Sequence, residues 1–234
     1  MRDKLTFLRN ETVARRRVTV RRGGLAACLA AILASAIGVG TASGDSENVQ
    51  RTPMRWHAQS GETPMSPVGD RAGAKLSRTS GGISYSIKTD SLRAGHAYTV
   101  WVVVINHPAA CDSSPCSPTD IFKNPDTDAQ VLYGGSGHVV GSSGEAGFGG
   151  HLSRGPLPQG WLPDQGLENP REAEVHLVLN DHGPKLAEYM PGMIRTYRAG
   201  CKDEGLPAIF PASAKADGEP GPNTCTLWQV AVFE

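Results

Sequence analysis

Hydrophobic and polar residues alternate in short segments through most of the chain beyond residue 75, and one segment is apolar throughout. Nearly every residue of 98–106 is β-branched or aromatic, which suits a pleated and packed strand. Read with a period of two, Tyr98 and Val100 point to one face while Thr99 and Trp101 point to the other. Because both faces are apolar, this segment is predicted to be a central strand that is covered on both sides.

Shorter alternating segments predict further strands, and almost no helix. Segment 83–87 has the pattern of a half-buried strand, and 173–180 is expected to point Val175, Leu177 and Leu179 inward and Glu174, His176 and Asn180 outward. A hairpin is predicted around Ser142-Ser-Gly144, between short strands at 138–141 and 145–152, and 226–233 is expected to be the last strand. The fold expected is therefore all-β: a single antiparallel β-sandwich, or a partly open barrel, with long Gly/Pro loops.

The first 43 residues differ from the rest. A basic stretch precedes an apolar run at 25–39 rich in alanine and small residues, which is typical of a secretory signal peptide. We therefore expect three parts: a signal peptide over 1–43, a flexible Pro/Gly-containing arm over 44–74 and a β-sandwich domain over 75–234. A retained anchor and export by the twin-arginine route through Arg21-Arg22 are the alternatives. The expected location is secreted, periplasmic or on the cell surface, without membrane attachment after cleavage.

Removing this leader changes the charge of the chain. The whole sequence is neutral, with 23 basic and 23 acidic residues. Residues 1–43 hold eight of the basic and two of the acidic residues, so the remainder is mildly acidic, with a net charge of −6. A nucleic-acid partner, which would require a basic face, is not expected.

Four cysteines remain beyond the leader: Cys111, Cys116, Cys201 and Cys225. An even number in an exported chain predicts two disulfides, and three pairings are possible. The pairing of neighbours in sequence, Cys111 with Cys116 and Cys201 with Cys225, is the one we favour. A zinc site is the alternative, but neither pair has the close C-x-x-C spacing of such sites.

Several segments together resemble a family of uncharacterised exported bacterial proteins. They are Gly82–Ile87, Leu92–Trp101, Asn106–Cys111, Gly137–Gly141 and Glu174–Pro184 with a closing cysteine, and they span most of the chain from Lys75 to Phe233. The resemblance implies secretion and a compact β domain. It supplies no activity, cofactor or site, and His107 stands where relatives of this kind often have a second asparagine.

Histidines are the residues with the clearest potential for chemistry. On the strand assignments above, His151 and His176 face outward, and they come within reach of one another if their strands are neighbours. His138 and His182 lie close to these two in sequence. Four such imidazoles on one edge would bind copper or zinc, although no H-x-H or H-E-x-x-H spacing occurs. Scattered surface histidines are the alternative.

No other motif indicates a reaction. Asn124-Pro-Asp126-Thr-Asp128 resembles the start of a calcium loop but lacks the later glycine and glutamate, which favours an Asx-rich turn. Gly134–His138 has histidine where a nucleophile elbow needs its last glycine. We therefore expect no catalytic or cofactor-binding residue, and a non-enzymatic binding or structural module for a surface or protein partner. A copper- or zinc-binding sandwich with a redox role is the alternative.

Overall fold

A computed structural model describes residues 48–157, 160–162, 166–205 and 207–234. The predicted signal peptide lies outside these residues. All strand pairs within them are antiparallel. Strands make up 44% of the described residues and form open sheets that do not close into a barrel, so the sandwich form of the prediction is confirmed.

Two sheets form the layers of the sandwich. The four-stranded sheet has the order β1 (Asn48–Pro53), β3 (Gly73–Thr79), β4 (Gly82–Thr89), β7 (Ala146–Ser153). The five-stranded sheet has the order β2 (Arg55–Trp56), β11 (Thr226–Phe233), β10 (Glu174–Pro184), β5 (His96–Ile105), β6 (Ala129–Val139). A small pair of strands, β8 (Gly155–Pro156) and β9 (Gly166–Leu167), stands apart from both. β5 lies between β10 and β6, as expected of the most apolar strand.

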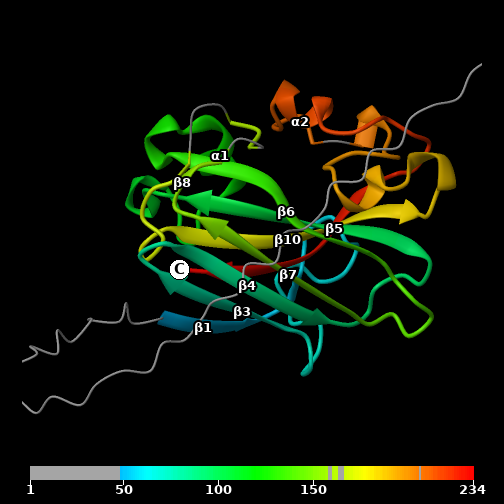
Figure 1. Ribbon diagram of the computed structural model, residues 1–234, viewed down its shortest axis with the longest axis horizontal. Helices are drawn as coiled ribbons and strands as arrows, with labels where there is room; N and C mark the ends of the chain where they lie inside the picture. The colour runs from blue at the N-terminus through cyan, green and yellow to red at the C-terminus, as the bar shows by residue number, and fades with distance from the viewer. Residues whose placement is uncertain (1–47, 158–159, 163–165, 206) are drawn as a thin grey trace, which may run out of the picture. The chain divides into compact units, whose positions relative to one another are not determined.

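Helical segments are short and cover the five-stranded sheet on the side away from its partner sheet (Figure 1). The α-helices are α1 (Pro118–Lys123) and α2 (Ala212–Ala216). The 3-10 turns are η1 (Pro108–Ala110), η2 (Pro125–Thr127), η3 (Ala187–Tyr189), η4 (Gly192–Ile194) and η5 (Asp203–Gly205). Segment 185–197 contains two separate 3-10 turns, η3 and η4, on either side of Pro191. No helix in the described part of the chain is long and apolar enough to cross a membrane.

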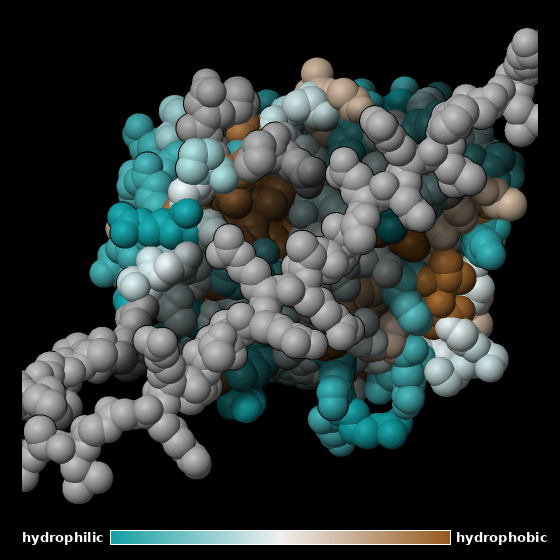
Figure 2. All heavy atoms as spheres, viewed as in Figure 1, coloured by the Kyte–Doolittle hydropathy of each residue, from teal (hydrophilic) through white to brown (hydrophobic). Residues whose placement is uncertain are grey.

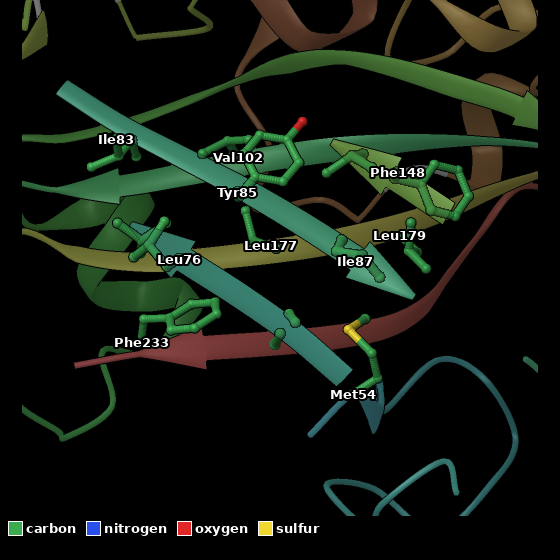
Figure 3. Packing of buried hydrophobic residues seen from close by; sticks show 14 of the residues in the cluster. Met54, Leu76, Ile83, Tyr85, Ile87, Val102, Phe148, Leu177, Leu179 and Phe233 are labelled. Carbon is green, nitrogen blue, oxygen red and sulfur yellow. The ribbon is translucent and has the colours of Figure 1, made fainter. Parts of the chain in front are cut away.

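The main core lies between the two sheets. Tyr98, Val100, Val102 and Val104 point into it from β5, and Val175, Leu177 and Leu179 from β10, as the alternation predicts. Figure 3 shows Leu76, Ile83, Tyr85 and Ile87 of the four-stranded sheet packing onto Val102, Leu177, Leu179 and Phe233 of the other. Apolar area removed from water here is the main source of stability, at about 25 cal/mol per Å².

One predicted boundary is corrected. The arm expected over 44–74 belongs to the sandwich from Asn48 onward, because β1 pairs with β3 and β2 pairs with β11. Met54, between these two strands, is fully buried, and Trp56 packs edge-on against Trp228 with ring centroids 5.4 Å apart. The sequence shows no clear strand pattern here, because β1 ends at Pro53 and β2 has only two residues.

The predicted hairpin around Ser142 is also wrong. β6 runs unbroken from Ala129 to Val139 and pairs with β5, whereas β7 pairs with β4 in the other sheet. The turn therefore carries the chain from one layer to the other.

Two glycines allow the layers to approach: a Cβ on Gly134 would lie 2.2 Å from the Tyr85 hydroxyl, and one on Gly150 would lie 2.4 Å from the Gly134 carbonyl oxygen. Tyr85 uses this closeness to donate a 2.6 Å hydrogen bond to that carbonyl.

Both disulfides have the favoured pairing. Cys111 bonds to Cys116, and Cys201 bonds to Cys225, with Cα–Cα distances of 5.5 and 5.4 Å. The first closes the loop that leads into α1. The second ties the segment after η4 to the start of β11. Disulfides of this kind stabilise a domain mainly by restricting the unfolded chain.

Candidate ligand-binding cavity

The outer face of the five-stranded sheet carries a second hydrophobic cluster. Trp101 and Val103 of β5, with Val178 of β10, point away from the main core by the same alternation that points their neighbours into it. Ile121 and Phe122 of α1, together with Phe210, form a layer over them. This layer is what covers the Trp101 face of the central strand.

Four aromatic rings form the centre of this cluster: Trp101, Trp161, Tyr197 and Phe210. Trp101 and Trp161 meet edge-on, with centroids 5.1 Å apart, and Tyr197 lies 4.1 and 3.8 Å from them. Phe210 lies 5.7–6.1 Å from the other three rings. Edge-to-face pairs of this kind add to the stabilisation from burial and fix the orientation of each ring.

Side chains of this cluster line a cavity of about 270 Å³ between the sheet and its covering layer. The aromatic rings of Trp101, Trp161, Phe122 and Phe210 line it, together with aliphatic side chains of β5, β6, β10 and β11. Figure 2 shows hydrophobic surface in a hollow close to α1, among hydrophilic side chains. Cavities lined mainly by apolar and aromatic groups with a few polar atoms are the usual form of a small-molecule site.

The wall formed by α1 is held by one carboxylate. Asp120 accepts hydrogen bonds from the backbone N–H of Asp112 and from both the N–H and the hydroxyl of Ser117, the N-cap residue. These bonds, led by that from Asp112, lower the pKa of Asp120 to about 2. The result is a capping box that joins the Cys111–Cys116 loop to α1 and sets the position of Ile121.

Two histidines provide polar groups at the cavity. Burial lowers the pKa of His57 to about 4, and its Nδ1 accepts the Gln59 N–H at 3.2 Å, so its imidazole is neutral at physiological pH. His176 lies 2.5 Å, from Nε2 to Oε1, from Glu174, and Glu174 also accepts the Cys116 N–H at 2.8 Å. His176 points away from the main core, as the alternation predicts, but that face of the sheet is covered rather than exposed to solvent.

Two buried donors in the aromatic cluster have no hydrogen-bond partner among the residues the structure describes. They are the indole N–H of Trp161 and the hydroxyl of Tyr197. Trp161 is only 3% exposed and lines the cavity. A buried donor without a partner is destabilising by about 1–3 kcal/mol, and such exceptions in a folded protein call for an explanation.

The four histidines predicted as metal ligands do not converge on one ion. His151 lies on β7 of the four-stranded sheet, where its Nδ1 is 2.9 Å from the Ser84 hydroxyl. His176 and His182 are both on β10 but six residues apart, about 20 Å along an extended strand. His138 lies on β6 opposite Tyr98. The prediction assumed that β7 and β10 are neighbours, and they belong to different sheets.

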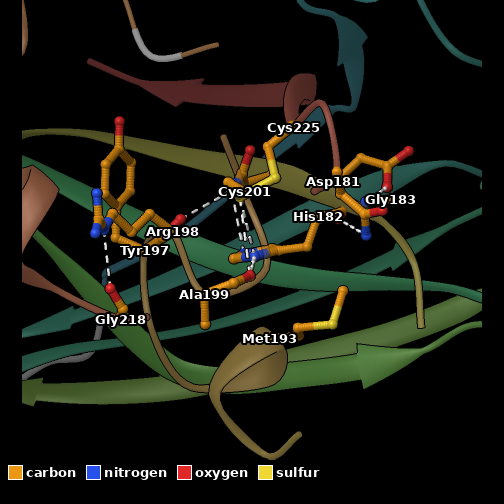
Figure 4. The surroundings of a disulfide bond; sticks show 12 residues. Asp181, His182, Gly183, Met193, Tyr197, Arg198, Ala199, Cys201, Gly218 and Cys225 are labelled. Atoms are coloured by element: carbon orange, nitrogen blue, oxygen red, sulfur yellow. Dashed lines mark hydrogen bonds between the residues drawn. A yellow bond between two sulfur atoms is a disulfide. The ribbon is translucent and has the colours of Figure 1, made fainter. Parts of the chain in front are cut away.

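His182 has a structural environment instead. Figure 4 shows it beside the Cys201–Cys225 disulfide and Ala199. Its Nδ1 donates to the Ala199 carbonyl at 2.9 Å, while Nε2 is 2.9 Å from the Thr99 hydroxyl and 3.1 Å from the Asn180 amide nitrogen. The nearby cysteine sulfurs are joined in the disulfide. Both ring nitrogens are therefore occupied, which leaves this imidazole no lone pair for a metal.

Together the fold and the cavity define a class: an antiparallel β-sandwich with two disulfides and a small aromatic cavity on the outer face of one sheet. Comparison of the chain with protein-family models, with curated proteins and with solved structures finds no match.

Proposed function

We propose that this protein is an exported, non-enzymatic binding module whose cavity holds a small aromatic molecule with a hydrogen-bond acceptor. The observation that carries the proposal is the indole N–H of Trp161, which is buried in the wall of an aromatic cavity without a partner in the described chain. An acceptor on the ligand would pair with this N–H, and the ligand ring would pack against Trp101 and Phe210.

The size of the cavity sets the size of the ligand. An apolar cavity of about 150 Å³ is enough to hold benzene in another protein. The 270 Å³ available here suits one substituted ring or a fused pair of rings. Trp101 and Trp161 are each only 3% exposed, so a broad protein surface does not reach them. This favours a small molecule over a macromolecular partner.

The lining favours binding over reaction. Among the described residues that line the cavity there are two histidines, but no hydroxyl group and no free thiol, since Cys116 is in a disulfide. A nucleophile next to a base is the arrangement that covalent catalysis requires. Aromatic faces and one or two hydrogen-bonding groups are sufficient for recognition.

Export is supported by two features of the chain. Two disulfides are present, and such bonds persist in oxidising compartments outside the cytoplasm. The basic and apolar character of the first 43 residues agrees with a secretory leader. A location in the periplasm, on the cell surface or in the medium is therefore part of the proposal.

Two probes of nearly equal size test the proposed site. Acetophenone carries a carbonyl acceptor, and ethylbenzene has the same ring without one. We expect the protein to bind both in calorimetric titrations, and acetophenone more tightly. Replacing Trp161 with phenylalanine is expected to weaken acetophenone binding by about 3- to 10-fold, the equivalent of one lost hydrogen bond, and to affect ethylbenzene less.

Trp228→Phe is the matched control. Trp228 packs in the main core with its N–H bonded to the Ser91 carbonyl, away from the cavity, so its replacement should leave both affinities unchanged. The proposal is wrong if neither probe binds at millimolar concentration, or if the two variants lose affinity equally.

A further inference from the structure

Three chain segments meet at one end of the sandwich and bring together an imidazole and two carboxylates. His107 follows β5, Asp128 precedes β6, and Glu168 follows β9. One nitrogen of His107 and one oxygen from each carboxylate all lie within 4.8 Å of one another. We propose that these three side chains form a binding site for a divalent transition-metal ion of the zinc type. This site is separate from the aromatic cavity.

A buried amide fixes two of the three segments. Asn106, which is 5% exposed, donates from Nδ2 to the Asp128 carboxylate at 2.8 Å and to the Gly166 carbonyl at 2.7 Å. Its Oδ1 accepts the Glu168 N–H at 3.0 Å. One side chain thus holds the carboxylate of Asp128 and the backbone of Glu168 before any ion binds. Outer hydrogen bonds of this kind orient the ligands of metal sites.

The orientation of the imidazole also fits a ligand. His107 Nδ1 lies 3.2 Å from the Asp126 carbonyl oxygen, which can only accept a hydrogen bond, so Nδ1 carries the proton. The lone pair is then on Nε2, the nitrogen that lies 4.0 Å from Glu168 Oε2. A backbone carbonyl that fixes the tautomer in this way is a common partner of metal-bound histidines.

Metal binding requires only a modest shortening of the distances between the three ligand atoms. Ligand bonds to zinc are about 2.0–2.2 Å long, so neighbouring ligand atoms in a tetrahedral site lie about 3.4 Å apart. His107 and Glu168 have side chains that are 58% and 65% exposed, which leaves them free to rotate by the remaining ångström. One imidazole with two carboxylates is a ligand set that favours zinc and its neighbours over magnesium or calcium.

The site has room for coordination positions that the protein does not fill. His107 and Glu168 also line a polar cavity of about 460 Å³, together with Arg154 and Arg171. Three protein ligands and an open fourth position facing such a cavity are the arrangement of an exchangeable zinc site, as opposed to a closed structural one.

Calorimetric titration of the untagged protein, freed of metal with EDTA, tests the proposal. We expect one Zn²⁺ to bind per chain in the micromolar range, with Ca²⁺ and Mg²⁺ at least 10-fold weaker. Replacing His107 with alanine, or Glu168 with glutamine, should each weaken Zn²⁺ binding by 10-fold or more. Asp128→Asn should do the same while keeping an acceptor for Asn106 and a residue that tolerates the positive φ of 47° at this position.

His151→Ala is the matched control, because it removes another exposed imidazole on the opposite sheet. Its zinc affinity should equal that of the unchanged protein. No zinc binding, or equal affinity in the unchanged and His107→Ala proteins, would overturn the proposal. Loss of binding in His151→Ala alone would do so as well.

Discussion

Replacing Arg78 with methionine is expected to lower the free energy of unfolding by about 3–4 kcal/mol. Arg78 lies on β3 at a position that alternation directs into the core, two residues after Leu76. It is only 1% exposed. A guanidinium group therefore occupies a place where the pattern of the strand calls for an apolar side chain.

Four hydrogen bonds compensate this buried charge, and each acceptor is a neutral oxygen. Nη1 donates to the carbonyls of Pro170 and Ala173 at 3.0 and 2.7 Å, Nε to the Gln50 side chain at 2.7 Å, and Nη2 to the Phe233 carbonyl at 3.4 Å. Burial lowers the pKa of Arg78, but arginine stays protonated in proteins. The side chain thus links β1, the segment before β10 and the end of β11.

Methionine has a similar length but no donor, so the substitution leaves buried carbonyls without partners. Hydrogen bonds from charged donors are worth about 1.5–3 kcal/mol each, and removal of the desolvation penalty of the guanidinium offsets part of the loss. Urea unfolding followed by circular dichroism measures the difference. Arg51→Met, an exposed arginine on β1, should stay within about 0.5 kcal/mol of the unchanged protein. An equally small effect at Arg78 would contradict this role.

Much of the sandwich follows from local patterns in the sequence. The two-faced apolar run at 98–106 identifies a strand with cover on both sides, and alternation in 173–180 gives the right inward residues. Sequence proximity selects the right disulfides. These features depend on neighbours within a few residues, so a single sequence contains the information needed for them.

Layer assignments and strand partners depend on distant contacts, and there the predictions fail. Nothing near Ser142 distinguishes a hairpin from a turn that crosses between sheets; the difference is that β4 is available to pair with β7. β1 and β2 are too short and too polar to be recognised as strands from the sequence, and their positions are set by pairing with β3 and β11. Arg78 is a similar case, because its acceptors come from segments 28 to 155 residues away.

The candidate sites show the same limit. Trp161 and Phe210 lie in long Pro/Gly loops, and only the fold brings them onto the Trp101 face. No local pattern in the sequence indicates that His107, Asp128 and Glu168 lie together, because their convergence depends on the fold and on Asn106. The predicted metal site at four histidines is not formed, because it required two strands to be neighbours that lie in different sheets. No local pattern in the sequence shows which strands are neighbours.

Acidification is expected to destabilise the protein well before its carboxylates are protonated, because of His182. Burial lowers the pKa of this imidazole from 6.5 to about 4 in the folded state. Between pH 6.5 and pH 4 the unfolded chain therefore binds a proton that the folded protein does not bind. The free energy of unfolding falls as the pH falls through this interval. One pKa unit is worth about 1.4 kcal/mol, which makes the loss between pH 7.5 and 4.5 about 2.5 kcal/mol.

The surroundings of His182 explain why the folded protein resists its protonation. The Nε2 lone pair points at the Thr99 hydroxyl, which in turn accepts the indole N–H of Trp101. A proton on Nε2 would remove this acceptor and place a charge among fully buried groups next to the disulfide (Figure 4). Protonation is therefore expected to weaken the contacts that this imidazole makes with Thr99 and with the disulfide.

Urea unfolding at pH 7.5 and at pH 4.5 measures this loss, and His182→Gln separates it from other groups. Glutamine does not titrate, so the variant should be less stable at pH 7.5 but should lose about 2.5 kcal/mol less on acidification. The pKa of His57 is also lowered to about 4, but this side chain is partly exposed. It should therefore contribute a smaller change of the free energy of unfolding with pH, which His57→Gln removes. An unchanged pH dependence in His182→Gln would mean that His182 is protonated in the folded protein. The hydrogen bond from Thr99 to His182 would then be absent at low pH, and with it the link between the cavity face and the disulfide.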